Sequence, residues 1–124
     1  MRRSLTPEIG WIELEILRPN ELFDGFKSRL NMFALHFDEV INLPQPWIVL
    51  AQSARCAVQV MRYGDRPVFG IQAHPEITPE RARMLMKGLA KRAPEHISTV
   101  EKVLAGRPKD DELAGEIVRR FLAL

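Results

Sequence analysis

The chain has 124 residues, 46% of them apolar and 27% charged, which suits one compact domain and is too apolar for a disordered protein. Its net charge of +2 is too small to indicate a nucleic-acid-binding protein, and no apolar run is long enough to span a bilayer. One cysteine excludes an internal disulfide, and the first residues lack the apolar stretch of a signal peptide, so we expect a cytoplasmic protein with no membrane or nucleic-acid partner.

The first half of the chain predicts five short strands. Residues 9–17 alternate apolar and polar side chains, as in a strand with one buried face. Four further extended segments follow a loop that contains a short helical turn, at residues 32–43, 47–51, 57–63 and 67–73. The connections are too short for crossover helices, so most neighbouring strands should be antiparallel.

The second half predicts three helices. Thr78 can cap a helix that begins at Pro79, and apolar residues then recur at helical spacing. A second helix is predicted to open at Pro94, and a third after Asp110 or Asp111, either of which can cap it.

Strands followed by helices indicate an α+β domain, or part of a larger α/β domain. We expect a single domain over residues 1–124, strand-rich at 8–74 and helical at 78–124. Five short strands can cover only part of the apolar stripes of three helices, so some apolar surface should remain for a partner.

His74 and Glu76, at the carboxyl end of the fifth predicted strand, are the first candidates for chemistry. Residues two apart in an extended segment point to the same side, and Pro75 stiffens the segment between them. A carboxylate beside an imidazole can accept the Nδ1 proton and leave Nε2 as a base, which is the orienter-and-base part of a nucleophilic triad. The alternative is a surface turn, with Glu76 near the positive end of the next helix.

A nucleophile for such a triad is harder to find. Cys56 is the only thiol, and it lacks the strand, glycine-lined turn and helix of a nucleophile elbow, so it reads as a small apolar residue at a strand edge. Ser53 is no better placed. The polar residues 36–39 can in principle form a metal site with His74 and Glu76, although hydrogen bonds between loop and strand are the simpler interpretation. We expect neither a metal nor a cofactor.

Five stretches match one known family in their order and spacing. They are PEIGW (7–11), HFDEV (36–40), LP (43–44), VLAQSARCAVQVMRYGDRPVFGIQAHPEITPE (49–80) and IVRRFLAL (117–124). In these stretches the chain resembles the class I glutamine amidotransferases, in particular the stand-alone type similar to the amidotransferase domain of GMP synthase.

This resemblance implies a flavodoxin-like fold, with a twisted, mainly parallel sheet and helices on both faces. It also implies hydrolysis of glutamine to glutamate and ammonia by a Cys-His-Glu triad, in which His74 and Glu76 match the base and its orienter. One departure is that the His-Gly-Asp of the family reads His36-Phe37-Asp38 here, which places a bulky ring at a tight glycine position.

The nucleophile elbow of the family, Gly-x-Cys-x-Gly, lies well before the PEIGW stretch, and only six residues precede Pro7 here. The chain thus looks like the carboxyl-terminal portion of such a domain, and Cys56 does not match the catalytic cysteine. We expect the chain alone not to hydrolyse glutamine. It can be part of a larger amidotransferase, one subunit of a split enzyme, or a non-catalytic binding or assembly module. An exposed sheet edge would favour a homo-oligomer or a partner chain that carries the nucleophile.

Overall fold

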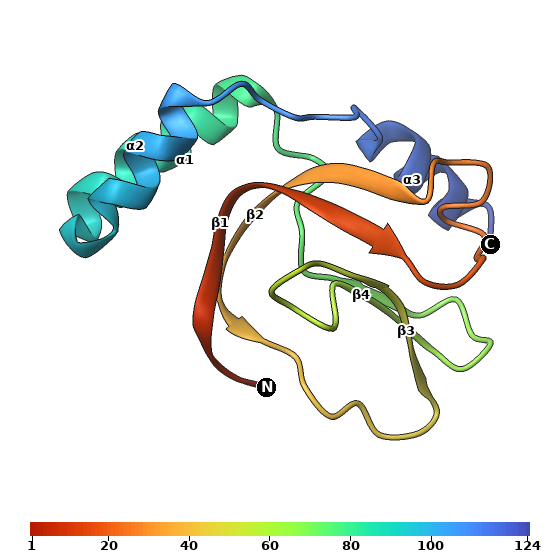
Figure 1. The fold of residues 1–124 in the computed structure, drawn as a ribbon. Helices are drawn as coiled ribbons and strands as arrows, with labels where there is room; N and C mark the ends of the chain where they lie inside the picture. Colours follow the sequence, from red (N-terminus) through yellow and green to blue (C-terminus); the bar gives the residue numbers. More distant parts are fainter.

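The computed structural model describes residues 1–124, and the first half of the chain forms one antiparallel sheet (Figure 1). Its strands are β1 (Arg2–Ile16), β2 (Arg29–Glu39), β3 (Trp47–Gln52), β4 (Val60–Tyr63) and β5 (Phe69–Ile71), in the order β2-β1-β3-β4-β5. Every neighbouring pair is antiparallel, as the short connections predicted. The mainly parallel sheet that the resemblance implies does not form within these residues, because no helix connects one strand to the next.

Strand β1 begins earlier than the apolar alternation predicted, at Arg2 instead of Ile9. Arg2 and Arg3 lie opposite Glu39 and Asp38 in the ladder and form ion pairs with them, at 2.7 and 3.6 Å. Charge pairing across the ladder, which periodicity does not report, therefore extends the strand.

Three other strands have bounds that differ from the prediction, and β2 begins at Arg29 instead of residue 32. β2 ends at Glu39 instead of residue 43, and Asn42 adopts a left-handed φ of 52° in the turn that follows. β4 covers only Val60–Tyr63 and β5 only Phe69–Ile71, and the residues beside them make irregular hydrogen bonds, some of them to side chains. The Val58 carbonyl, for example, accepts a hydrogen bond from the Gln72 side-chain amide at 2.7 Å.

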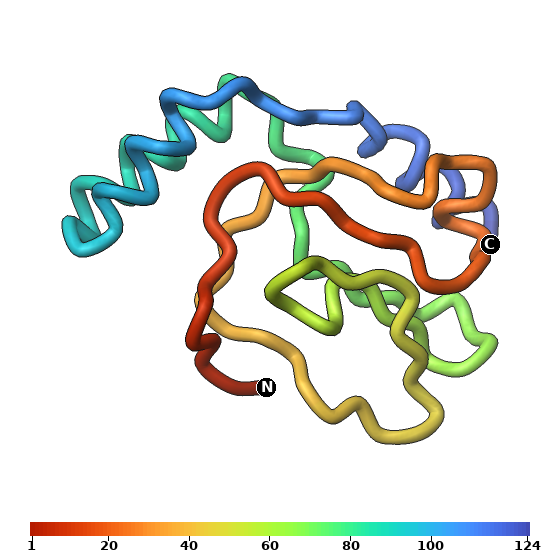
Figure 2. Tube along the Cα trace, in the orientation of Figure 1, coloured from red at the N-terminus to blue at the C-terminus, as the bar shows by residue number.

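The sheet curls until its two edge strands approach at one point. β2 and β5 lie at opposite ends of the strand order, yet the His74 N–H donates to the Phe33 carbonyl at 2.7 Å. In the trace of Figure 2, the green segment after β5 crosses the orange β2 on its way to the helices. This contact fixes the backbone of His74 against the middle of β2.

The helices are α1 (Pro79–Arg92), α2 (Ile97–Ala105), which follows the 3₁₀ turn η1 (Pro94–His96), and α3 (Ala114–Leu122). α1 begins where the sequence predicted, because the Thr78 hydroxyl accepts the Arg81 N–H at 3.3 Å and Pro79 needs no donor partner. None of the helices has the length and apolar character that a membrane crossing requires.

The predicted cap of the third helix is wrong. Leu113 occupies the N-cap position of α3 and offers no side-chain cap. Asp110 instead accepts the Glu112 N–H at 2.9 Å, and Asp111 accepts the Asn31 N–H at 2.7 Å. The Asp111 carboxylate thus satisfies a donor on the free edge of β2, a long-range use that local sequence does not reveal.

Alternation along β1 and β2 gives the sheet two apolar faces, and different helices cover them. On one face Phe33 packs with Met86 of α1 and Val100 of α2. On the other, Leu14 packs in a cluster with Ile117 of α3. Figure 1 shows the α1–α2 hairpin projecting on one side of the sheet and α3 lying apart from it. The segment from β5 to α1, which contains His74, passes between them.

Candidate functional site

The His74 and Glu76 side chains meet directly after β5. Nδ1 of His74 lies 2.8 Å from a carboxylate oxygen of Glu76, so the contact that the spacing predicted is present. A carboxylate can only accept, so Nδ1 carries the proton, and Nε2 makes no hydrogen bond within the chain. The His74 side chain is 43% exposed, which leaves Nε2 accessible to an incoming group.

An open pocket of about 220 Å³ lies beside this pair. Its walls come from β2, from the segment after β5 and from α1, and are mostly apolar: Phe33, Leu35, His74, Glu76, Ile77 and Leu85. The pair therefore has a mostly apolar wall on one side and solvent on the other, since its two side chains are 43% and 60% exposed.

The single thiol lies outside this pocket and is buried. Cys56 is 2% exposed, and its sulfur contacts the Val58 carbonyl at 3.5 Å and the Gln72 side-chain amide at 3.2 Å. Burial raises the pKa of the Cys56 thiol, which disfavours the thiolate that nucleophilic attack requires. The Ser53 hydroxyl is also hydrogen-bonded within the chain, since it donates to Glu8 at 2.6 Å.

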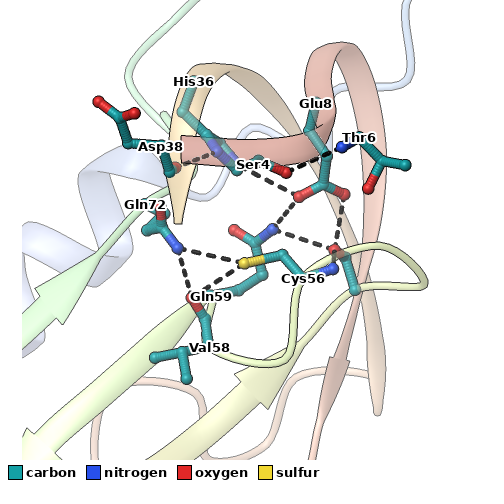
Figure 3. Close-up of polar contacts among 10 residues, drawn as sticks. Ser4, Thr6, Glu8, His36, Asp38, Cys56, Val58, Gln59 and Gln72 are labelled. Carbon is teal, nitrogen blue, oxygen red and sulfur yellow. Dashed lines mark hydrogen bonds and ion pairs between the residues drawn. The ribbon is translucent and has the colours of Figure 1, made fainter. Parts of the chain in front are cut away.

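The second polar cluster centres on Glu8, a residue that the sequence reasoning did not single out (Figure 3). Its carboxylate is 4% exposed and accepts hydrogen bonds from His36, Ser53 and Gln59. The sequence did indicate its burial, because Glu8 is an even number of residues from the buried Leu14 and so points to the same face of the strand. An acidic residue at a position that alternation marks as buried indicates a partnered carboxylate.

The structure does not bring the two polar clusters together. Both ring nitrogens of His36 are used within its own cluster, at 2.9 Å from the Asp38 carbonyl and 3.1 Å from Glu8. The hydrogen bond to Glu8 raises the pKa of His36 above its ordinary value of 6.5. No group of three His, Cys, Asp or Glu side chains is placed to hold a metal ion, so the metal interpretation of residues 36–39 with His74 is wrong.

Comparison with known proteins gives a consistent result. The family model described as glutamine amidotransferase class-I matches residues 4–91. A subunit of glutamine-hydrolyzing GMP synthase from Methanothermobacter thermautotrophicus is 48% identical over 66 residues, which are 53% of this chain and 36% of that protein. The protein of the same name from Pyrococcus abyssi is 35% identical over 90 residues, 72% of this chain and 48% of that protein. The chain thus spans less than half the length of these relatives.

Solved structures show the same fold. A putative GMP synthase subunit from Thermoplasma acidophilum is 28% identical and superposes with a TM-score of 0.59, over 78% of this chain and 51% of that one. A glutamine amidotransferase from Thermotoga maritima is 24% identical, with a TM-score of 0.67 over 98% of this chain and 52% of that one. The five antiparallel strands and three helices are therefore an arrangement found within larger proteins.

Proposed function

The chain belongs to the class I glutamine amidotransferase family, and on that premise we propose that it supplies the base and the orienting carboxylate of a glutaminase site. The observation that carries this proposal is the 2.8 Å hydrogen bond from His74 Nδ1 to Glu76, which leaves Nε2 free beside an open pocket. We propose glutamine as the substrate, with glutamate and ammonia as products.

The proposed chemistry follows from this geometry. Nε2 of His74 takes the proton of a cysteine thiol, and the thiolate attacks the side-chain amide carbon of glutamine. The imidazolium then gives its proton to the departing nitrogen, which leaves as ammonia. Water, deprotonated by Nε2, cleaves the glutamyl thioester and regenerates the thiol. Glu76 keeps the proton on Nδ1 and stabilises the imidazolium in each half of the cycle.

We propose that the nucleophile comes from polypeptide outside these 124 residues. Cys56 is the only thiol, and it is buried with a raised pKa. Residues 1–124 are then part of one amidotransferase domain whose remaining residues, on the same chain or another, carry the cysteine. β5 is an edge strand with an open side, next to which such a segment can bind. Similarity to proteins named as subunits of GMP synthase favours an ammonia-consuming partner of the GMP synthase type.

A complementation assay tests this proposal. The purified chain is mixed with the part of the Methanothermobacter relative that lies outside the 66-residue match, and glutamate release is measured. We expect no turnover from either polypeptide alone, turnover from the mixture, and none when the chain carries His74→Ala. Glu80→Gln is the matched control, because Glu80 is an exposed acidic residue of the first turn of α1.

Two results would contradict the proposal. Turnover by the chain alone that His74→Ala abolishes would place the nucleophile inside these residues, and Cys56→Ser would identify it. A mixture that binds glutamine without hydrolysing it would instead indicate a non-catalytic binding module.

A further inference from the structure

The buried Glu8 carboxylate connects three segments of the chain: β1, β2 and the loop between β3 and β4 (Figure 3). Glu8 lies on β1 and accepts hydrogen bonds from His36 on β2 at 3.1 Å, from Ser53 after β3 at 2.6 Å, and from Gln59 just before β4. The backbone ladder between β1 and β3 ends at Glu15, and an open pocket of about 490 Å³ separates the two segments beyond it. On the far side of that pocket, the Glu8 side chain connects the segments in place of the ladder.

The His36 ring carries two protons in this arrangement. Its Nε2 faces a Glu8 carboxylate oxygen and its Nδ1 faces the Asp38 carbonyl oxygen, at 3.1 and 2.9 Å. Both oxygens can only accept, so both nitrogens must donate, and the ring is an imidazolium. The His36 and Glu8 side chains are 13% and 4% exposed, so each charge depends on the other for stabilisation.

The loop that Glu8 holds leads to His74. Ser53 connects Glu8 to this loop, between β3 and β4, because its hydroxyl oxygen also accepts a backbone N–H of the loop at 3.1 Å. Gln72, two residues before His74, donates hydrogen bonds to three atoms of the same loop: the carbonyl oxygens of Val58 (2.7 Å) and Gln59 (2.8 Å) and the sulfur of Cys56 (3.2 Å). On its other side, the His74 N–H is bonded to β2, the strand that carries His36.

We propose that Glu8 and doubly protonated His36 form a positioning pair for the base His74. The pair joins β1, β2 and the loop after β3, and these segments fix the backbone on both sides of His74. His74 thereby keeps Nδ1 on Glu76 and presents Nε2. This inference rests on the proposed function, since the orientation of His74 affects a rate only if His74 is the base of a glutaminase site.

Nitrogen NMR of the imidazole rings in the chain alone tests the pair without reference to catalysis. At neutral pH we expect both nitrogens of His36 to be protonated, and the proton of the neutral His74 ring to lie on Nδ1. Ser53→Ala together with Gln59→Leu removes both side-chain links from Glu8 to the loop but leaves the charge pair, so His36 should be unchanged while His74 becomes a mixture of tautomers. The control is Asp111→Asn, which weakens a hydrogen bond to Asn31 elsewhere on β2 and should alter neither ring.

A pH titration of the unmodified chain gives a second reading that needs no variant. The other charges near His36 are already paired, since Glu39 binds Arg2 and Asp38 binds Arg3. The loss of the His36 proton should therefore leave Glu8 uncompensated. We expect the His74 tautomer to become mixed in the same titration step in which His36 loses its charge. A His36 ring with one proton at neutral pH would overturn the proposal, as would a His74 that stays ordered through that step.

The complementation assay separates this inference from the proposed function. In the mixture, the double variant Ser53→Ala, Gln59→Leu should lower kcat about tenfold or more with little change in KM, because a base that is slightly out of position slows the reaction. Full activity of the folded double variant with an unchanged His74 ring would overturn the positioning role and leave the glutaminase proposal intact. Absence of all turnover in the unmodified mixture would contradict the glutaminase proposal, while the NMR readings would still decide whether the pair orders His74.

Discussion

At the scale of single residues, the Glu76 carboxylate determines which nitrogen of the His74 imidazole carries the proton. Glu76→Gln keeps the size of the side chain but replaces the pure acceptor with an amide that can donate to Nδ1. The wrong tautomer would then place the proton on Nε2. In the complementation assay we expect Glu76→Gln to lower kcat by roughly 10²- to 10⁴-fold, as for loss of the orienting carboxylate in a triad.

The matched control for Glu76→Gln is Glu80→Gln, which removes the same charge from an exposed site nearby and should leave kcat within about twofold. Nitrogen NMR of His74 in the chain alone gives an independent reading of the tautomer. A Glu76→Gln variant that keeps both the Nδ1-protonated ring and full activity would show that Glu76 is only a surface residue.

Gly10 is a second single residue whose substitution should strongly affect stability. It adopts a φ of 115°, and a Cβ built there would lie 2.7 Å from a methyl carbon of Val103 on α2. Gly10→Ala therefore combines backbone strain with a clash, and should lower the free energy of unfolding by about 2–4 kcal/mol. Gly115→Ala on α3 meets no atom within 4 Å and should raise that free energy by about 0.5–1 kcal/mol.

Urea denaturation of both glycine variants checks this prediction. Adding Val103→Ala to the Gly10→Ala variant should restore only the part of the free energy of unfolding that the clash removes, since the unfavourable φ remains. Equal stability of the Gly10→Ala and Gly115→Ala variants would mean that α2 does not pack this closely on β1.

The sequence located some site residues and missed others for a physical reason. His74 and Glu76 are two residues apart, so strand geometry alone predicts that their side chains can meet. Glu8 finds its partners 28 and 45 residues away, at His36 and Ser53. Local spacing carries no information about such contacts. Alternation could indicate only that Glu8 is buried, and not which donors satisfy it.

At the scale of elements, α3 packs on the sheet through Ile117 and bonds to the loop between β1 and β2 through Arg120. Ile117 is 4% exposed in the core, while Arg120 donates to the backbone carbonyls of Leu22 and Asp24. Ile117→Ala should lower the free energy of unfolding by about 2–4 kcal/mol, because it removes buried methyl groups and leaves a cavity. Val118→Ala, at a neighbouring position that is 55% exposed, should change it by less than about 0.5 kcal/mol.

Thermal and urea unfolding of the two α3 variants provide the measurement. If Ile117→Ala proved no more costly than Val118→Ala, α3 would not belong to the folded unit.

The elements that sequence predicted well are those specified locally. The start of α1 depends on Thr78 and Pro79, which are adjacent, and the helix begins there. The start of α3 was assigned to a cap by Asp110 or Asp111, but Asp111 bonds to Asn31, 80 residues away. The early start of β1 likewise depends on pairing with the end of β2. Long-range partners decided these boundaries, and propensity could not reveal them.

The Glu8–His36 pair, which joins β1 to β2, should make the free energy of unfolding depend on pH. The pKa of His36 is raised in the folded chain, so the stabilisation is complete below its ordinary value of 6.5. As pH rises above that value, the unfolded state loses the proton first, and the stabilisation disappears as pH passes through the raised pKa. The urea concentration at the unfolding midpoint should therefore decrease as the pH rises from about 6.5 through the raised pKa of His36.

Glu8→Gln provides the comparison for this pH dependence. Without the carboxylate the pKa of His36 should return toward its ordinary value, so the variant should be less stable at low pH and its midpoint should depend less on pH. A wild-type midpoint that stays constant over this range would exclude a charged Glu8–His36 pair.

At the scale of the whole molecule, the structure leaves apolar surface uncovered. α3 exposes Val118, Phe121 and Leu122, at i, i+3 and i+4, with exposed fractions of 55%, 45% and 76%. β2 and β5 are edge strands, and β5 has backbone groups free on one side. An apolar helix face together with an open sheet edge favours association, either with a second copy or with the polypeptide that carries the nucleophile.

We therefore expect the isolated chain to self-associate at micromolar concentrations, which light scattering would detect as a mass above the 14.2 kDa of the monomer. The double variant Val118→Lys, Leu122→Lys should shift the equilibrium toward monomer, because burying a charged helix face in an interface is unfavourable. Met84→Lys on α1 changes an equally exposed apolar residue, 71% exposed, and should have no such effect. If the complementing polypeptide binds the same face, its addition should dissociate the homo-oligomer. The double lysine variant should then lose both complementation and self-association. A monomer at all concentrations would show that these edges and this face are stable in water without a partner.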